Sequence, residues 1–281
     1  MACHVSNGFY SSLRKQGANK RTGGALSEKS ILEHHRLISL ILKKAVDEGV
    51  LPTNVASAAE SPKIKKKSTP RYFRKDMLIE ILTCAKQASL RDRLIINLLA
   101  TIGCRKGELL GLTFGDIDLS NGNININKAV LYTKKMGVYI DSTKGCVERS
   151  NAIPKNVIDL VLQYKEKYIS YRDSFADWHG SDNLDDCFLF VQSNGNPMHP
   201  DTITNILRRF AKKHNLGKIN AHAFRHTYAS LLILNGVDIV TVSTLMGHAE
   251  IATTMRYYSH LMNNTGKVSQ AHMGALLKEI E

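Results

Sequence analysis

The stretch INAHAFRHTYASLLILNGVDIVTVSTLMGHAEIATTMRYYSHL, residues 219–261, places reactive side chains at spacings that packing alone does not require. Near its start, His222 and Arg225 stand three residues apart at the beginning of an apolar-periodic run, so a helix there puts both on one face of its first turn. Backbone N–H groups at the positive end of a helix, together with a guanidinium, suit a phosphate ligand. The motif therefore predicts an anion site at the start of this helix.

Two further motifs follow in the same stretch. In LMGH, Gly247 can end a helix and leave His248 on the turn after it. Ten residues beyond that histidine, YYSHL supplies the phenol of Tyr258 among polar neighbours, an unusual setting for an aromatic side chain that serves only a core. The adjacent Tyr257 competes with it for any chemical role.

The order of these motifs resembles that of the tyrosine recombinase family, the phage-type and conjugative-transposon integrases. In that family an HxxR motif, a later LGH and a terminal TYSHL-like motif with a nucleophilic tyrosine follow one another; here they read HAFR, LMGH and YYSHL. The resemblance implies that Tyr258 is the nucleophile, because residues 258–261 match the terminal motif. Relatives with a shorter spacing after the LGH histidine would instead select Tyr257.

The resemblance extends upstream. TIGCRKGELLGL, residues 101–112, is similar to the family motif that carries a first catalytic arginine, which falls on Arg105 here. Glu108, three residues later, shares a helical face with Arg105 and can fix the guanidinium by a charge-assisted hydrogen bond. A predicted β-hairpin presents Lys144 in a TK pair, which matches the family's position for a catalytic lysine.

The resemblance implies how these side chains would cleave DNA with a phenol. The tyrosine would attack phosphorus and form a 3′-phosphotyrosine that conserves the bond energy, so neither ATP nor a metal or other cofactor is needed. Arg105, Arg225 and His248 would bind the phosphate oxygens as negative charge increases there. By analogy with the family, His222 would take the phenolic proton and Lys144 would protonate the leaving 5′-oxygen.

The composition favours a nucleic-acid partner. The 281 residues include 38 Lys and Arg against 25 Asp and Glu, a formal charge of +13, and 43% hydrophobic residues suffice for a real core. The five cysteines are odd in number and show no CxxC spacing, so neither a disulfide framework nor a zinc ribbon is indicated, and a reducing cytoplasm fits. No apolar run reaches membrane-spanning length.

The sequence divides into three parts. Residues 1–60 include an amphipathic helix predicted over residues 27–49 and capped by Ser27, and they resemble the second half of the family's helical, SAM-like core-binding domain. Residues 61–75 form a basic linker, expected to be a solvated tether that also follows the DNA backbone. Its candidate DNA-binding residues are Lys63, Lys65, Lys66, Lys67, Arg71 and Arg74. Residues 76–281 correspond to the family's catalytic domain.

The residue pattern of the catalytic part predicts its fold class, mainly α with a small antiparallel β-sheet (α+β). Helices are predicted over residues 75–88, 90–102, 155–174 and 201–215, the last with a basic face. Alternation over residues 117–142 predicts the sheet, and CFLFV at 187–191 predicts a short buried strand. Residues 267–281 predict a short amphipathic helix.

Of three other interpretations, the first is disfavoured and two remain open. His222 and His226 stand four residues apart as in some zinc sites, but the glutamate of HExxH is missing and no third ligand is evident, so no metal is expected. Residues 238–246 and 251–258 also fit a helix-turn-helix, which would make the chain a non-catalytic DNA-binding regulator. The third is a decayed integrase, because the helical domain is incomplete by comparison with the family.

For an active recombinase the family implies specific partners. The substrate would be double-stranded DNA with attachment sites, bound by a homotetramer across two duplexes, and a directionality factor could join the complex. A type IB topoisomerase shares this chemistry, but the compact spacing from HxxR through LGH to the tyrosine resembles the recombinases.

Overall fold

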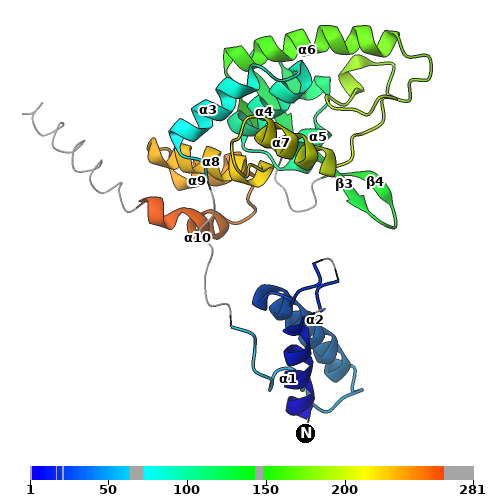
Figure 1. The fold of residues 1–281 in the computed structure, drawn as a ribbon, viewed down its shortest axis with the longest axis vertical. Helices are drawn as coiled ribbons and strands as arrows, with labels where there is room; N and C mark the ends of the chain where they lie inside the picture. Colours follow the sequence, from blue (N-terminus) through cyan, green and yellow to red (C-terminus); the bar gives the residue numbers. More distant parts are fainter. Residues whose placement is uncertain (1, 17, 21, 64–71, 143–147, 263–281) are drawn as a thin grey trace, which may run out of the picture. The chain divides into compact units, whose positions relative to one another are not determined.

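A computed structural model of the chain describes residues 2–16, 18–20, 22–63, 72–142 and 148–262. Contacts between residues divide the chain into two compact units, Met1–Thr69 and Pro70–Glu281. Each unit has buried hydrophobic residues of its own. The smaller unit holds α1 and α2, and the larger unit holds the other helices and the strands (Figure 1).

Helices α1 (Ala2–Leu13) and α2 (Glu28–Asp47) form the smaller unit. Ser27 caps α2 as predicted, because its hydroxyl accepts a hydrogen bond from the backbone N–H three residues on, at 3.1 Å. The core is small and consists of Tyr10, Ile31 and Ala59 with partly buried neighbours. Ile41, on the predicted apolar stripe of α2, is 58% exposed, so the stripe is less covered than its pattern predicts.

Helix α4 (Leu90–Ile102) is central to the core of the larger unit, as its apolar composition predicts. Six of its residues are fully buried. It contacts α3 (Lys75–Ala85), α6 (Lys155–Asp173) and α8 (Ala221–Leu234). The remaining α-helices of the described residues are α5 (Lys106–Gly111), α7 (Asp201–Lys213), α9 (Ile239–Met246) and α10 (Ile251–Met262).

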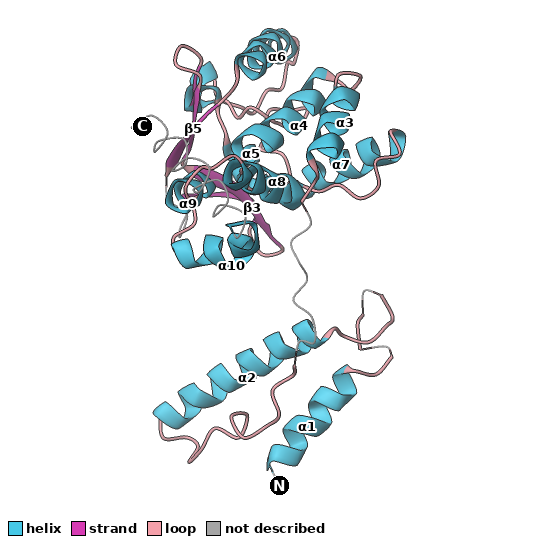
Figure 2. Cartoon of the chain, turned by 90° about the vertical axis from the view of Figure 1, so that its left-hand side faces the viewer, coloured by secondary structure: helices cyan, strands magenta, loops and turns pink. Residues whose placement is uncertain are grey.

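The strands form two antiparallel sheets. One has the order β1-β2-β5, with β1 at Ile117–Asp118, β2 at Asn123–Ile126 and β5 at Arg149–Ala152. The other pairs β3 (Lys128–Thr133) with β4 (Gly137–Ser142). β3 contacts α5 and β5 contacts α9 (Figure 2). The mainly helical α+β class is confirmed, although the strands make two small sheets where the sequence predicts one.

The structure corrects the strand predicted at residues 187–191. This segment pairs only through isolated bridges, Phe188 with Thr113 and Val191 with Pro197. The pairing of Phe188 with Thr113 does not extend into a strand, because the chain enters the 3₁₀-helix η1 (Phe114–Asp116) directly after Thr113. The predicted burial holds, since the side chains at 187, 189 and 190 are at most 2% exposed.

The ends of several helices differ slightly from the prediction. α3 ends at Ala85 where the sequence predicts residue 88, and α7 ends at Lys213 where it predicts residue 215. The amphipathic helix predicted for residues 267–281 lies outside the described residues. Within the part of the chain that the structure describes, no helix has the length and apolar character needed to cross a membrane.

Candidate active site

The first turn of α8 carries the HxxR motif. Asn220 caps this helix by accepting a hydrogen bond from the Ala223 N–H at 2.9 Å, so the helix begins where the motif predicts. His222 is exposed, whereas Arg225 is buried with 3% of its surface accessible. The Arg225 guanidinium donates to two backbone carbonyls, those of Gly103 at 2.8 Å and of Met246. Arg225 therefore joins α8 to the ends of α4 and α9.

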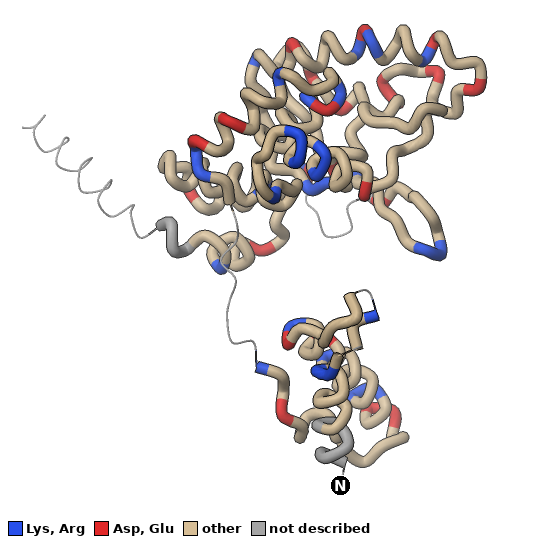
Figure 3. Tube along the Cα trace, viewed as in Figure 1, with Lys and Arg blue, Asp and Glu red and all other residues tan. Residues whose placement is uncertain are grey.

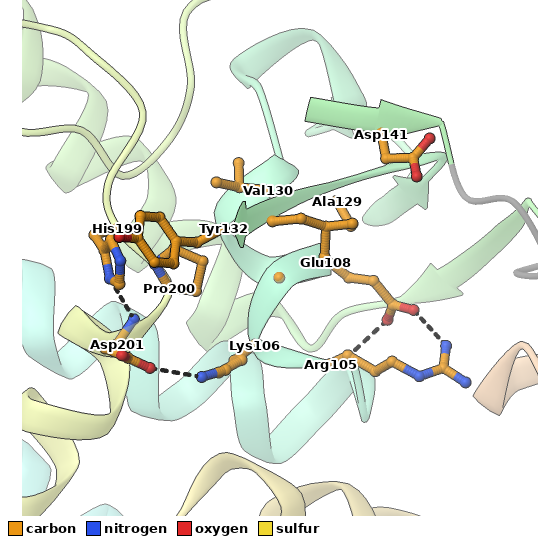
Figure 4. A pocket seen from close by; sticks show the side chains of 12 residues that line it. Arg105, Lys106, Glu108, Ala129, Val130, Tyr132, Asp141, His199, Pro200 and Asp201 are labelled. Carbon is orange, nitrogen blue, oxygen red and sulfur yellow. Dashed lines mark hydrogen bonds and ion pairs between the residues drawn. The ribbon is translucent and has the colours of Figure 1, made fainter. Parts of the chain in front are cut away.

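Arg105 and Glu108 form the predicted hydrogen bond, although Arg105 precedes the helix and does not share a helical face with Glu108. Arg105 is the N-cap of α5, and its Nη1 donates to Glu108 Oε1 at 2.6 Å. Its backbone N–H donates to Glu108 Oε2 at 2.8 Å, so the carboxylate holds both ends of the residue (Figure 4). The Glu108 side chain is buried, while the Arg105 side chain is 41% exposed and faces solvent.

A third arginine, Arg149 on β5, completes this cluster, and the sequence prediction missed it. Its Nη2 donates to Glu108 Oε2 at 2.6 Å, and both side chains are 1% exposed. Arg225 Nη1 lies 3.9 Å from the same carboxylate oxygen. Nε and Nη1 of Arg149 are buried without a hydrogen-bond partner among the described residues. We name Arg105, Arg149, Arg225 and Glu108 the arginine cluster.

The arginine cluster carries a net positive charge. Burial alone would raise the pKa of Glu108, but the hydrogen bond and charge of Arg149, with the backbone N–H and charge of Arg105, lower it to about 2. Burial and the charge of Arg105 lower the pKa of Arg225 to about 10, which leaves that guanidinium protonated at neutral pH. Three guanidiniums around one ionised carboxylate favour an incoming anion such as a phosphate.

Gly247 ends α9 as predicted, with a left-handed φ of +61°. A Cβ there would also lie 2.6 Å from Arg149 Nη1, so the LMGH turn passes directly over the arginine cluster. His248 follows, and its Nδ1 lies 2.7 Å from the Thr254 hydroxyl of α10. Burial, with the charges of Arg225 and Arg105, lowers the pKa of His248 to about 4.

Tyr258 on α10 is buried, at 2% exposure, and its hydroxyl lies 2.6 Å from His226 Nδ1 on α8. The neighbouring Tyr257 is 43% exposed, and its hydroxyl makes no hydrogen bond within the described residues. Burial raises the pKa of the Tyr258 phenol, although the charge of Arg225 opposes this rise. Burial, His222 and Arg225 lower the pKa of His226 to about 4. The two tyrosines therefore differ clearly in environment.

The structure brings most of the predicted residues together. Arg105, Glu108 and Arg225 share the arginine cluster, and Arg225 acts electrostatically on both His248 and Tyr258. His222 packs perpendicular to His226, with 4.6 Å between ring centroids, and burial with the charges of Arg225 and Arg105 lowers its pKa. Lys144 lies outside the described residues.

The linker residues divide between described and undescribed parts of the chain. Lys65, Lys66, Lys67 and Arg71 lie outside the described residues, whereas Lys63 and Arg74 are exposed. Further basic side chains lie on α7, where Arg208, Arg209, Lys212 and Lys213 are exposed, and at the turn between β3 and β4 (Figure 3).

A cavity of about 620 Å³ opens beside Arg105, between α5, β3 and the start of α7 (Figure 4). Its wall includes Tyr132 and His199, whose ring centroids are 4.4 Å apart, and an ion pair of 3.0 Å between Lys106 and Asp201. Among the described residues, no three His, Cys, Asp or Glu side chains come close enough together to hold a metal ion.

Comparisons with known proteins agree on one family. Residues 71–264 match the sequence model of the phage integrase family. The ICEBs1 integrase of Bacillus subtilis (strain 168) is 26% identical over 243 residues, which cover 86% of this chain and 64% of that protein. The tyrosine recombinase XerC of Myxococcus xanthus is 30% identical over 224 residues, which cover 78% of this chain and 68% of XerC.

The fold is also similar to that of solved structures. The Tn1549 transposon integrase, in complex with circular intermediate DNA, superposes with a TM-score of 0.75 at 20% identity, covering 96% of this chain and 86% of that one. The chain spans just under two thirds of the length of the ICEBs1 integrase. The family match covers most of the larger unit, including the arginine cluster, His248 and Tyr258, and on this evidence the chain belongs to the phage integrase family.

Proposed function

We propose that the chain is a site-specific DNA recombinase that cleaves and rejoins DNA through a 3′-phosphotyrosine at Tyr258. The observation that carries the proposal is a buried phenol, hydrogen-bonded to an imidazole, beside a cluster of three arginines. Phosphoryl transfer needs such a nucleophile together with fixed positive charge at the phosphorus.

Arg105 and Arg225 are the proposed phosphate ligands. Arg105 is 41% exposed, so a DNA phosphate can reach its guanidinium, and Glu108 holds that guanidinium in place. Arg225 is held by two backbone carbonyls and is therefore preorganised for the transition state. A single preorganised donor typically contributes about 3 kcal/mol to such a transition state. His248, whose Nδ1 lies 2.7 Å from the Thr254 hydroxyl, adds a proposed donor from the turn after α9.

In the proposed reaction Tyr258 Oη attacks phosphorus, the bond to the 5′-oxygen breaks, and the departing strand end becomes a 5′-hydroxyl. Lys144 is the proposed acid that supplies the proton for this hydroxyl, on the basis of its TK motif. Attack of a 5′-hydroxyl on the phosphotyrosine reverses the step and reseals the strand. The bond energy stays in the phosphodiester, so the proposal requires neither ATP nor a metal.

A mobile element is the proposed setting. Two of the similar proteins carry names of mobile elements, ICEBs1 and Tn1549, and the second was solved with circular intermediate DNA. We extend the proposal to double-stranded attachment sites as substrate, a homotetramer on two duplexes, a directionality factor as an accessory partner, and the cytoplasm as the compartment that holds this DNA. The basic linker and the smaller unit would add DNA contacts outside the active site.

Covalent capture tests the proposed function. DNA from the genome that encodes the chain is sheared, nicked at random and incubated with the chain in EDTA, and protein–DNA adducts that resist denaturation are recovered and sequenced. We expect an adduct enriched in one sequence, lost in Tyr258→Phe and retained in Tyr257→Phe. Loss of the adduct only in Tyr257→Phe would identify Tyr257 as the nucleophile. DNA binding without any adduct would overturn the proposal in favour of a non-catalytic DNA-binding protein.

A further inference from the structure

We infer that His226, rather than the HxxR histidine His222, receives the proton of the Tyr258 phenol during strand cleavage. The inference rests on the proposed function and deepens it, because it assigns the proton acceptor of the same active site. A phenol is a weak nucleophile until its proton leaves, so the acceptor contributes directly to the rate.

The geometry favours His226. Its Nδ1 lies 2.6 Å from the Tyr258 hydroxyl, within the reach needed for direct proton transfer. The phenol is 2% exposed, so bulk water has little access to take the proton instead. His222 is exposed, and its imidazole makes no hydrogen bond among the described residues. Its ring packs perpendicular to that of His226, with centroids 4.6 Å apart, which restrains the orientation of His226.

The protonation state of His226 also suits an acceptor. Burial, His222 and Arg225 keep its pKa near 4, so the imidazole is neutral at pH 7. With the hydroxyl donating to Nδ1, the ring proton resides on Nε2. Among the described residues, the other ionisable groups that act on this pair are His222 and Arg225 on the same helix, His248 on the turn after α9 and Tyr257 on α10.

Substrate binding would make His226 a stronger base. In the chain alone, burial raises the pKa of the phenol, and burial with the charge of Arg225 makes His226 a weak base, so the proton stays on Tyr258. A DNA phosphate held by the arginine cluster brings a negative charge that offsets the guanidinium charges acting on His226. The imidazole then becomes more basic when a phosphate is in place, and the nucleophile is activated on the substrate rather than before it.

The protons balance over both steps. As the bond from Tyr258 Oη to phosphorus forms, the phenolic proton passes to His226 Nδ1 and gives an imidazolium, while the leaving 5′-oxygen takes its proton from a separate acid. On resealing, the 5′-hydroxyl attacks phosphorus and returns its proton to the conjugate base of that acid, while the tyrosine leaves as phenolate and takes its proton back from the imidazolium. No oxidant, metal or added reactant enters either step.

The test measures single-turnover cleavage of the nicked duplex recovered by covalent capture. His226→Asn places an amide near the position of Nδ1 that can accept the hydroxyl hydrogen bond but cannot take the proton. We expect this variant to cleave about 100-fold or more slowly than the wild type and to lose the acidic limb of the pH–rate profile. His222→Asn is the matched control, and we expect it to retain that limb.

A substrate with a sulfur in place of the bridging 5′-oxygen separates the two proton transfers, because a thiolate leaves without an acid. We expect this substrate to rescue Lys144→Ala but not His226→Asn. DNA binding and thermal unfolding of each variant show whether the variant still folds. Cleavage by His226→Asn within about threefold of the wild type, or loss of the acidic limb in His222→Asn alone, would overturn the inference. If the wild type itself forms no adduct, the proposed function fails, and the role of His226 fails with it.

Discussion

Glu108 on α5 and Arg149 on β5 are 41 residues apart in the sequence, yet they form a buried ion pair of 2.6 Å. Glu108 also holds Arg105 and lies 3.9 Å from Arg225, so one carboxylate orders the guanidiniums of the arginine cluster. Arg149 comes from the sheet, Arg105 from the start of α5 and Arg225 from α8. The positive charge proposed to bind phosphate is therefore fixed by contacts between distant parts of the chain.

The double-mutant cycle of Glu108→Gln and Arg149→Met tests this pair. Glu108→Gln leaves the buried Arg149 charge without its carboxylate, and we expect a loss of about 3–5 kcal/mol in the free energy of unfolding. Arg149→Met leaves Glu108 with Arg105 and Arg225, so we expect a smaller loss. The double variant should be more stable than the sum of the two losses predicts, because neither charge is then left unpaired. Urea denaturation measures all four proteins. Additive losses would show that the pair is not coupled, and the exposed Glu80→Gln provides the control.

Arg105→Met should separate catalysis from stability. Because the side chain is 41% exposed, we expect its removal to change the free energy of unfolding by less than about 1 kcal/mol. The rate of adduct formation should fall by about 100-fold or more, since a preorganised phosphate donor is removed. Arg91→Met, at a side chain 42% exposed on α4, is the matched control and should leave the rate unchanged. Similar rates of adduct formation for the two variants would show that Arg105 does not contribute to catalysis.

Gly103 is expected to be intolerant of any side chain. It ends α4 with a left-handed φ of +58°, and a Cβ there would overlap the Tyr228 ring. Gly236 has a φ of +85°, and no atom lies within 4 Å of a Cβ built there. An alanine at this position would therefore experience the backbone strain without a packing clash. We expect Gly236→Ala to cost about 1 kcal/mol and Gly103→Ala about 1–3 kcal/mol more. Thermal or urea unfolding of the two variants measures the difference, and equal losses would contradict the packing argument.

The sequence predicted the elements whose signal is local. The apolar period predicted α4 with the bounds that the structure has, and the structure adds Ser89 as its N-cap, which accepts a hydrogen bond from the Asp92 N–H at 3.2 Å. The three-residue spacing of Arg105 and Glu108 predicted their hydrogen bond. Gly247 was predicted to end α9 because only a left-handed residue closes that turn easily.

The parts that the sequence did not predict depend on pairing between distant segments. Arg149 reaches Glu108 because β5 lies antiparallel to β2 with Arg149 opposite Ile126, and no local pattern contains that register. His226 was considered only as a metal ligand, because HxxR draws attention to His222 and Arg225. Which imidazole meets the phenol depends on how α10 packs against α8. The local signal that could have pointed to His226 was its position directly after Arg225, the arginine of the HxxR motif.

His226 and His248 are expected to make the fold sensitive to acid. Their pKa values are lowered from 6.5 to about 4 by burial and by neighbouring positive groups. Between about pH 6.5 and 4 the unfolded chain binds protons that the folded chain does not, so stability falls as the pH decreases through this window. Above pH 6.5 the imidazoles are neutral in both states and this effect is absent.

Urea midpoints measured from pH 7.5 to pH 4 test this expectation. The double variant His226→Gln, His248→Gln should show a flatter decline than the wild type over the same window. His179→Gln, at a side chain 50% exposed, is the control and should follow the wild type. A decline of equal slope in all three proteins would assign the acid sensitivity to other groups.

The basic linker is expected to contribute to DNA affinity through charge alone. Replacing Lys65, Lys66 and Lys67 with Gln removes three cations from a segment without acids. If each lysine neutralises one phosphate, the slope of log K against log salt should become shallower by about 0.9 for each lysine replaced, and binding should weaken to a similar extent on all sequences. Fluorescence anisotropy on a labelled duplex at several salt concentrations measures this slope. The exposed set Lys86, Lys155 and Lys167 gives a control of equal charge, and an equal change of slope in both variants would attribute the effect to net charge rather than to the linker.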